Sequence, residues 1–225
     1  MFDLVKRENQ IFNVLSEFIN NKLRFVIVGG YAVSAYKHRF SIDADIIIKK
    51  EDLKKFEEIL KKNKFNNSIS KELEHIYASE FKRYETKEKP SASIDILING
   101  IGSRTTNASF SLEQIEKHSK KRKIIGMEKE IIAIVPNKEI IIALKIHSGR
   151  LTDFRDIVAL CQNIEIEIIK EYTKIGNKNI LRENIKKLLE LIEKKEFIDS
   201  FKGVFQEKKY NIDLNEVKKL KELLE

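Results

Sequence analysis

The hydrophobic positions of the first 135 residues switch repeatedly between helical and strand-like spacing. Apolar residues three or four positions apart predict helices over residues 4–22, 30–37 and 51–62. Short apolar runs predict buried strands over residues 24–28, 42–48, 93–98, 123–125 and 131–134. A weaker alternation predicts one or two further strands within residues 73–85.

The pattern changes at Pro136, which suits the first turn of a helix because its missing N–H is not needed there. From this point helical spacing predominates, and it predicts helices over residues 136–147, 151–162, 165–174, 178–195 and 213–224. Mixed elements followed by helices alone predict an α+β fold. We therefore expect an α+β domain over residues 1–135, with a mixed sheet and helices, and a helical domain over residues 136–225.

The composition is that of a globular and strongly basic chain. Of its 225 residues 42% are hydrophobic, and the net charge is +8. Such a charge favours a polyanionic partner such as a nucleotide, RNA or DNA, although a generally lysine-rich surface would give the same value. The single cysteine, Cys161, excludes an internal disulfide and a cysteine-based zinc site.

The sequence carries no sign of a membrane or export segment. No run approaches the ~18 apolar residues of a membrane span. Charged residues come early in the N-terminal decapeptide, and no apolar core of a signal peptide follows. We therefore expect a cytoplasmic protein without a membrane partner.

Two aspartates on one predicted strand provide the first candidate chemistry. Asp43 and Asp45 are two positions apart, so their side chains point to the same face of the strand. Adjacent carboxylates repel each other unless a cation or a proton neutralises them. On an otherwise apolar strand they indicate ligands for a hard divalent cation, Mg²⁺ or Mn²⁺.

Two further features extend this candidate site. Gly29 and Gly30 end the preceding strand, where they would allow a close backbone approach to phosphate at the start of the next helix. Asp95 lies on a later apolar strand, in surroundings like those of Asp45. If the two strands are neighbours, Asp95 becomes a third metal-binding carboxylate that helps to activate an incoming hydroxyl group.

A strand, Gly-Gly, a helix, Asp-x-Asp and a later Asp occur in the order typical of nucleotidyltransferases with the DNA polymerase β-like fold, which the chain resembles. Residues 28–33 (VGGYAV) and 39–45 (RFSIDAD) resemble more specifically the AbiEii type, the nucleotidyltransferase toxins of type IV-like toxin–antitoxin systems. The resemblance covers roughly residues 24–160. It implies a metal-dependent enzyme that transfers a nucleotide from an NTP to an acceptor.

The resemblance also implies a role for residues after the predicted sheet. The AbiEii type has a lysine on one helix and an Arg/Asp-rich start of the next, and here Lys145, Arg150, Asp153 and Asp156 occupy these places. Lys145 is expected to neutralise a triphosphate oxygen. Asp153 and Asp156 remain alternatives for the functional carboxylate, and Arg39, just before the metal strand, is a candidate phosphate ligand.

The acceptor and the partners follow from resemblance and charge together. RNA, with tRNA as the leading candidate, fits the basic chain, whose lysines and arginine at positions 117 and 120–123 suit a phosphate backbone. A cognate antitoxin protein would be the partner of a toxin. Transfer to a small molecule of the antibiotic type or to a protein, and a non-catalytic antitoxin-like binding module, are the alternatives.

Overall fold

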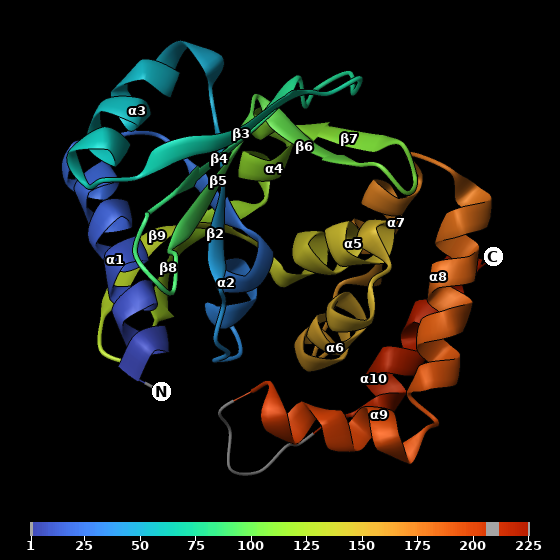
Figure 1. The fold of residues 1–225 in the computed structure, drawn as a ribbon. Coiled ribbons are helices and arrows are strands. Elements are labelled where there is room, and N and C mark those ends of the chain that lie inside the picture. Colours follow the sequence, from blue (N-terminus) through green and yellow to red (C-terminus); the bar gives the residue numbers. More distant parts are fainter. Residues whose placement is uncertain (1, 206–211, 225) are drawn as a thin grey trace.

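A five-stranded mixed sheet forms the centre of the fold (Figure 1). The structure is a computed structural model that describes residues 2–205 and 212–224. The strands are β1 (Val26–Val28), β2 (Asp43–Ile48), β3 (Asn66–Glu72), β4 (Glu80–Glu85) and β5 (Ser93–Ile98). Their order across the sheet is β1-β2-β5-β4-β3. The pair β2–β5 is parallel and the other pairs are antiparallel.

Two hairpins flank this sheet. One is formed by β6 (Gly100–Ser103) and β7 (Ala108–Ser111), the other by β8 (Ser119–Ile125) and β9 (Glu130–Pro136). Between them lies α4 (Leu112–Lys117), which begins with a reciprocal capping box between Ser111 and Gln114. The second hairpin packs through β9 against β1.

Three helices belong to the sheet-forming half: α1 (Phe2–Asn20), α2 (Gly29–Ser34) and α3 (Leu53–Lys62), the last preceded by the 3₁₀ turn η1 (Lys50–Asp52). Helices α1 and α3 pack together on one side of the sheet (Figure 1). Their contact is aromatic, since the ring centroids of Phe18 and Phe56 are 4.7 Å apart in an edge-to-face arrangement. Phe25 completes this cluster and anchors the start of β1.

Helices alone follow β9 in the described part of the chain. They are α5 (Lys138–Ser148), α6 (Leu151–Leu160), α7 (Ile166–Thr173), α8 (Lys178–Leu191), α9 (Lys195–Asp199) and α10 (Leu214–Lys218), with 3₁₀ turns η2 (Ser200–Gly203) and η3 (Lys219–Leu224). Helix α5 contacts α6, α7 and α8, which explains its nearly continuous apolar run. No described helix combines the length and apolar character needed to cross a membrane.

The predicted α+β fold is confirmed, with local corrections. Strand β3 was not predicted because it is an edge strand whose side chains are largely exposed, so it has no apolar pattern. The hairpin β6–β7, helix α4 and helix α9 were also missed, because short elements have little periodicity. Pro136 closes β9, and α5 begins only at Lys138. The division into two domains at residue 135 stays a prediction.

Candidate active site

The acidic residues of the two central strands stand in one row. In the parallel pair β2–β5, Asp45 is directly opposite Asp95, and Asp43 precedes Asp45 by two positions on the same face. On the other side of β2, Asp45 is directly opposite Val28, the last residue of β1. The predicted convergence of Asp43, Asp45 and Asp95 on one sheet face therefore has the required strand register.

Gly29 brings the backbone close to this row. Its φ of +64° lies in the left-handed region, which glycine adopts without steric cost. A Cβ atom at this position would overlap the carboxylate of Asp45. Gly30 is packed differently, because its α-carbon faces the side chain of Ser41. The glycine pair thus serves the local packing of Asp45 and Ser41.

Asp45 is the carboxylate of the row that most needs a cation. Burial raises its pKa, and the neighbouring charges of Asp43 and Asp95 raise it further, to about 7. Nearby Lys145 and Arg150 lower it only in part. A divalent cation would remove this penalty, since it would compensate the carboxylate charges directly.

An arginine on the next strand engages Asp95. Arg83 of β4 is directly opposite Asp95, and its Nε and Nη2 atoms lie 2.7 and 2.6 Å from Oδ1 and Oδ2 of that residue. Its Nη2 atom is also 3.4 Å from Oδ2 of Asp43. Burial raises the pKa of Asp95, although the pair with Arg83 works against this rise. One guanidinium therefore bridges two of the three carboxylates.

A group of charged side chains, the lysine network, connects α5 and α6; it consists of Lys145, Asp153 and Asp156. The ammonium of Lys145 lies 2.7 Å from Oδ1 of Asp153 and 2.8 Å from Oδ2 of Asp156. Burial opposes the charge of Lys145, but both carboxylates raise its pKa above the ordinary value. Burial likewise opposes the charge of Asp153, yet the contacts from Arg150 and Lys145 lower its pKa to about 2. Lys145 and Asp153 are therefore ionised at neutral pH.

Two arginines complete this network from opposite ends. Nε of Arg150 lies 2.7 Å from Oδ2 of Asp153 at the start of α6. Arg39, in the segment before β2, pairs with Asp156 through its guanidinium, while its backbone forms an isolated bridge with Phe205. The sequence left open which of Asp153 and Asp156 is important. In the structure both hold Lys145, and each is paired with its own arginine.

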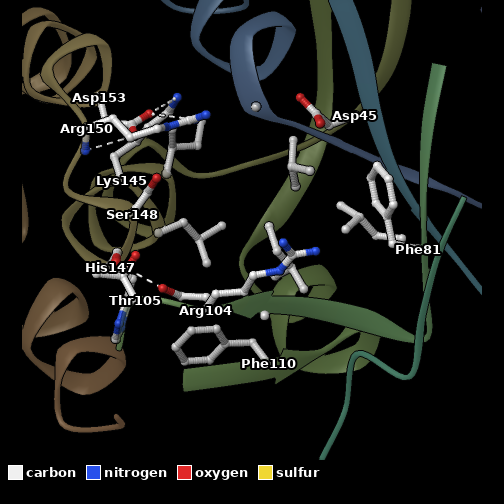
Figure 2. A pocket seen from close by; sticks show the side chains of 18 residues that line it. Asp45, Phe81, Arg104, Thr105, Phe110, Lys145, His147, Ser148, Arg150 and Asp153 are labelled. Carbon is white, nitrogen blue, oxygen red and sulfur yellow. Dashed lines mark hydrogen bonds and ion pairs between the residues drawn. The ribbon is translucent and has the colours of Figure 1, made fainter. Parts of the chain in front are cut away.

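The acidic row and the lysine network meet at one cavity of about 570 Å³ (Figure 2). Figure 2 shows Asp45 on one side and Lys145, Arg150 and Asp153 on the other. The remaining wall is mixed. Apolar residues such as Phe81, Leu97, Ile101 and Phe110 share it with polar ones, among them Ser103, Arg104, Thr105 and His147. A cavity that combines apolar and aromatic lining with a few charged groups is typical of a small-molecule or cofactor site.

His147 lines the cavity, but its contacts give it a structural role. The imidazole of His147 is held by Thr106 Oγ1 at 2.7 Å and the carbonyl of Tyr172 at 3.1 Å, and burial lowers its pKa.

Of the residues predicted for the site, Gly29, Asp45, Lys145, Arg150 and Asp153 line the cavity. Asp43, Asp95, Arg39, Gly30 and Asp156 are not among the lining residues, although Asp95, Gly30 and Asp43 neighbour lining residues and Asp156 contacts Lys145.

The donor set fits a divalent cation held by few protein ligands. Within residues 2–205 and 212–224, no three side chains of the Asp, Glu, His or Cys type converge to hold a metal ion. Mg²⁺ commonly binds through one or two carboxylates and completes its octahedron with water and phosphate oxygens. Asp43 and Asp45 meet this requirement, because they share one strand face and Asp45 opens into the cavity.

Sequence reasoning missed Arg83, Arg104 and Phe81. Phe81 and Arg83 are two positions apart in the weakly alternating segment, so a shared face could have been inferred. That this face lies beside Asp95 depends on strand order, which the sequence does not reveal. Arg104 lies in the β6–β7 turn, a hairpin that was not predicted.

No protein-family model matches the sequence, and no characterised protein sequence matches it either. Similar solved structures include the lincosamide antibiotic adenylyltransferase LnuA with bound lincomycin, at 18% identity and a TM-score of 0.43 over 74% of this chain and 98% of that one. JHP933 from Helicobacter pylori gives 14% identity and a TM-score of 0.49 over 98% and 90%.

The antibiotic-resistance factor ANT(2'')-Ia gives 15% identity and a TM-score of 0.50 over 73% of this chain and 87% of that one. This likeness concerns the fold, and it agrees with the strand, Gly-Gly, helix and Asp-x-Asp order observed around Asp45. The chain therefore shares its mixed α+β fold with ANT(2'')-Ia.

Proposed function

We propose that this protein is a metal-dependent nucleotidyltransferase, which moves NMP from an NTP to an acceptor and releases pyrophosphate. The observation that carries the proposal is the meeting of two charged groups at one cavity. Asp45 of the acidic row and Lys145 of the lysine network line it together. An NTP carries both a metal-binding polyphosphate and a largely apolar base, and this cavity offers surroundings for each.

The polyphosphate would lie between the acidic row and α5. Asp43 and Asp45 would hold Mg²⁺ or Mn²⁺, which when bound neutralises phosphate charge and polarises the reacting phosphorus. Lys145 and Arg150 face the same space and supply positive charge to phosphate oxygens. Because Lys145 is fixed by two carboxylates, it is already oriented before substrate binds, which is the kind of positioning that phosphoryl transfer requires.

The nucleoside would lie against the aromatic part of the wall. Phe81 and Phe110 offer aromatic surface for a base, and Leu97 and Ile101 close the wall between them. The volume of about 570 Å³ lies within the range of ordinary ligand sites. The acceptor would reach the α-phosphorus beside Asp45, where the cavity meets the strand row.

We infer RNA as the acceptor, with tRNA as the leading candidate. The net charge of +8 and the exposed Lys117, Lys120, Lys121 and Lys123 of α4 and β8 support this choice. The AbiEii resemblance extends the proposal to a toxin that acts in the cytoplasm and is restrained by a cognate antitoxin. Expression should then arrest bacterial growth, and Asp45→Asn should relieve the arrest.

Transfer to a small molecule is the second candidate. It is favoured by the size of the cavity and by the fold likeness to ANT(2'')-Ia, which is itself an antibiotic-resistance factor. The strongly basic chain opposes it for cationic acceptors, since like charges repel.

One experiment tests the activity and separates the two acceptors. The full chain is incubated with each α-³²P-labelled NTP and Mg²⁺, once with total RNA and once with a panel of hydroxylated antibiotics. Label on RNA supports the first proposal, and label on an antibiotic supports the second. Absence of both labels, together with absence of pyrophosphate release, contradicts the activity. Asp45→Asn is the matched negative control.

A further inference from the structure

The carboxylate of Asp95 is already occupied by a cation of the protein itself. Arg83 donates from Nε and Nη2 to its two oxygens, at 2.7 and 2.6 Å. This is the side-by-side geometry in which a guanidinium and a carboxylate form two parallel charge-assisted hydrogen bonds. The Asp95 side chain is 6% exposed and the Arg83 side chain 29%, so the carboxylate is buried while the guanidinium keeps some contact with water.

Strand pairing holds this ion pair in place. Arg83 and Asp95 are directly opposite each other on β4 and β5, and Asp95 is directly opposite Asp45 on β2. The guanidinium therefore stands on the sheet face where a metal ion bound by all three carboxylates would have to lie. Its Nη2 atom reaches 3.4 Å from Asp43 Oδ2, which extends its charge toward the Asp-x-Asp pair.

We propose that Arg83 takes the place of a metal ion at Asp95, so that the divalent cation binds through Asp43 and Asp45 alone. Asp95 is then a positioning residue, which holds Arg83 beside the metal site and is not a ligand. This inference rests on the proposed metal-dependent function and refines it. It replaces the expectation from the sequence that Asp95 is the third ligand.

Electrostatics supports this assignment. A metal ion at Asp95 would have to displace a bidentate arginine, and it would leave a guanidinium next to a doubly charged cation. Removing the arginine from the buried Asp95 carboxylate is costly because that charge loses its partner. Binding at Asp43 and Asp45 avoids this cost, since Asp43 has only one long contact to Arg83 and Asp45 lines the cavity.

The absence of a three-ligand cluster agrees with this view. No three acidic, histidine or cysteine side chains of the described residues converge on a possible metal position. Two carboxylates leave most of the coordination sphere to water and phosphate, which is the usual arrangement for Mg²⁺ at nucleotide sites.

The test measures metal binding in the absence of turnover. Mn²⁺ is titrated into the full chain, and free Mn²⁺ is followed by its electron paramagnetic resonance signal. The decisive variant is Arg83→Met with Asp95→Asn, which removes both charges of the pair and keeps the local net charge. Its Mn²⁺ affinity should equal or exceed that of the wild type. Arg83→Met alone should tighten binding, roughly tenfold, because it frees Asp95 beside the site.

Two comparisons distinguish an error in the proposed metal site from an error in the role of Arg83. Asp43→Asn with Asp45→Asn should abolish saturable Mn²⁺ binding. If binding persists in this variant, or if the wild type binds no Mn²⁺, the proposed metal site is wrong and the role of Arg83 is overturned with it. If those substitutions abolish binding but the double variant at positions 83 and 95 also loses tenfold or more, only the role of Arg83 is overturned. Circular dichroism checks the fold of each variant. The charge-neutral double variant decides the question even if Arg83→Met alone does not fold.

Discussion

The ammonium of Lys145 lies 2.7 Å from Oδ1 of Asp153, and the cavity that this pair lines is bounded on its other side by Asp45 (Figure 2). The pair is almost fully withdrawn from solvent, with side-chain exposures of 11% and 0%. A nucleotide phosphate at Lys145 therefore meets a lysine that is ionised and oriented in advance. The charge of Lys145 serves the fold and the proposed substrate at once.

Removal of the Lys145 charge should lower both the stability of the fold and the affinity for NTP. Lys145→Ala leaves two buried carboxylates without their common partner, so we expect a loss of about 3–5 kcal/mol in the free energy of unfolding, measured by urea denaturation. NTP binding should also weaken in variant protein that remains folded. Lys138→Ala is the matched control, because Lys138 lies on the same helix but contacts the backbone carbonyl of Asn163. Lys145→Ala with wild-type stability would contradict the observed network.

Metal and nucleotide together should stabilise the protein through Asp43 and Asp45. Binding to the native state alone adds about 2.7 kcal/mol at a hundredfold excess over Kd, which is visible as a rise in Tm. We expect Asp43→Asn with Asp45→Asn to abolish the rise caused by Mg²⁺ and NTP. Asp3→Asn, an exposed carboxylate of α1, should leave it intact. A full shift in the double variant would exclude these residues as ligands.

Gly29→Ala tests the approach of the backbone to Asp45. The left-handed backbone alone should cost on the order of 1–3 kcal/mol, and the added methyl group must also displace the carboxylate. Gly149→Ala is the matched control, since Gly149 has nearly the same φ, +66°, but faces Asn184. Both variants should unfold at lower urea concentration, whereas only Gly29→Ala should weaken Mn²⁺ binding. Equal Mn²⁺ affinities in the two variants would contradict the link between Gly29 and Asp45.

Acid should weaken the lysine network in a defined range of pH. Burial opposes the charge of Asp153, but Arg150 and Lys145 hold its pKa at about 2, below the value of about 4 in an unfolded chain. A lowered pKa stabilises the folded state above the unfolded pKa, and this contribution is lost as pH falls from about 4 to about 2. The loss should be on the order of 2 kcal/mol. Asp153→Asn should show a shallower decline of unfolding free energy over this range, and an unchanged slope would speak against the assignment.

RNA binding should depend steeply on salt. Contacts of lysine and arginine with phosphates release counterions, with a log–log slope of about −0.7 per contact for single strands. Lys120→Glu with Lys121→Glu, which changes two exposed residues of β8, should weaken tRNA binding and reduce this slope in a filter-binding titration, without a change in NTP affinity. Lys54→Glu with Lys61→Glu on α3 carries the same charge change and is the control. No tRNA binding at low salt would favour a small-molecule acceptor.

Much of the candidate site could be predicted because its elements are local. Asp43 and Asp45 share a face because strand side chains alternate, and Gly29 follows a strand end where a turn was expected. Asp153 and Asp156 are three positions apart on one helix, so their common direction was also implicit in the sequence. Burial of α5 followed from its apolar run.

The alternation of elements, the acidic strand face and the helical C-terminal part could be predicted, because these features depend on spacings of two to four residues. Three relationships became visible only in the folded chain: Asp45 is opposite Asp95, Arg83 pairs with Asp95, and Arg39 pairs with Asp156 across 117 positions. Strand order and helix docking arise from burial of whole apolar faces, and a given set of such faces can be buried in several arrangements. The partners of Arg83 and Arg39 are therefore a consequence of packing, whereas the pair of Arg150 with Asp153, three positions apart, is local in the sequence.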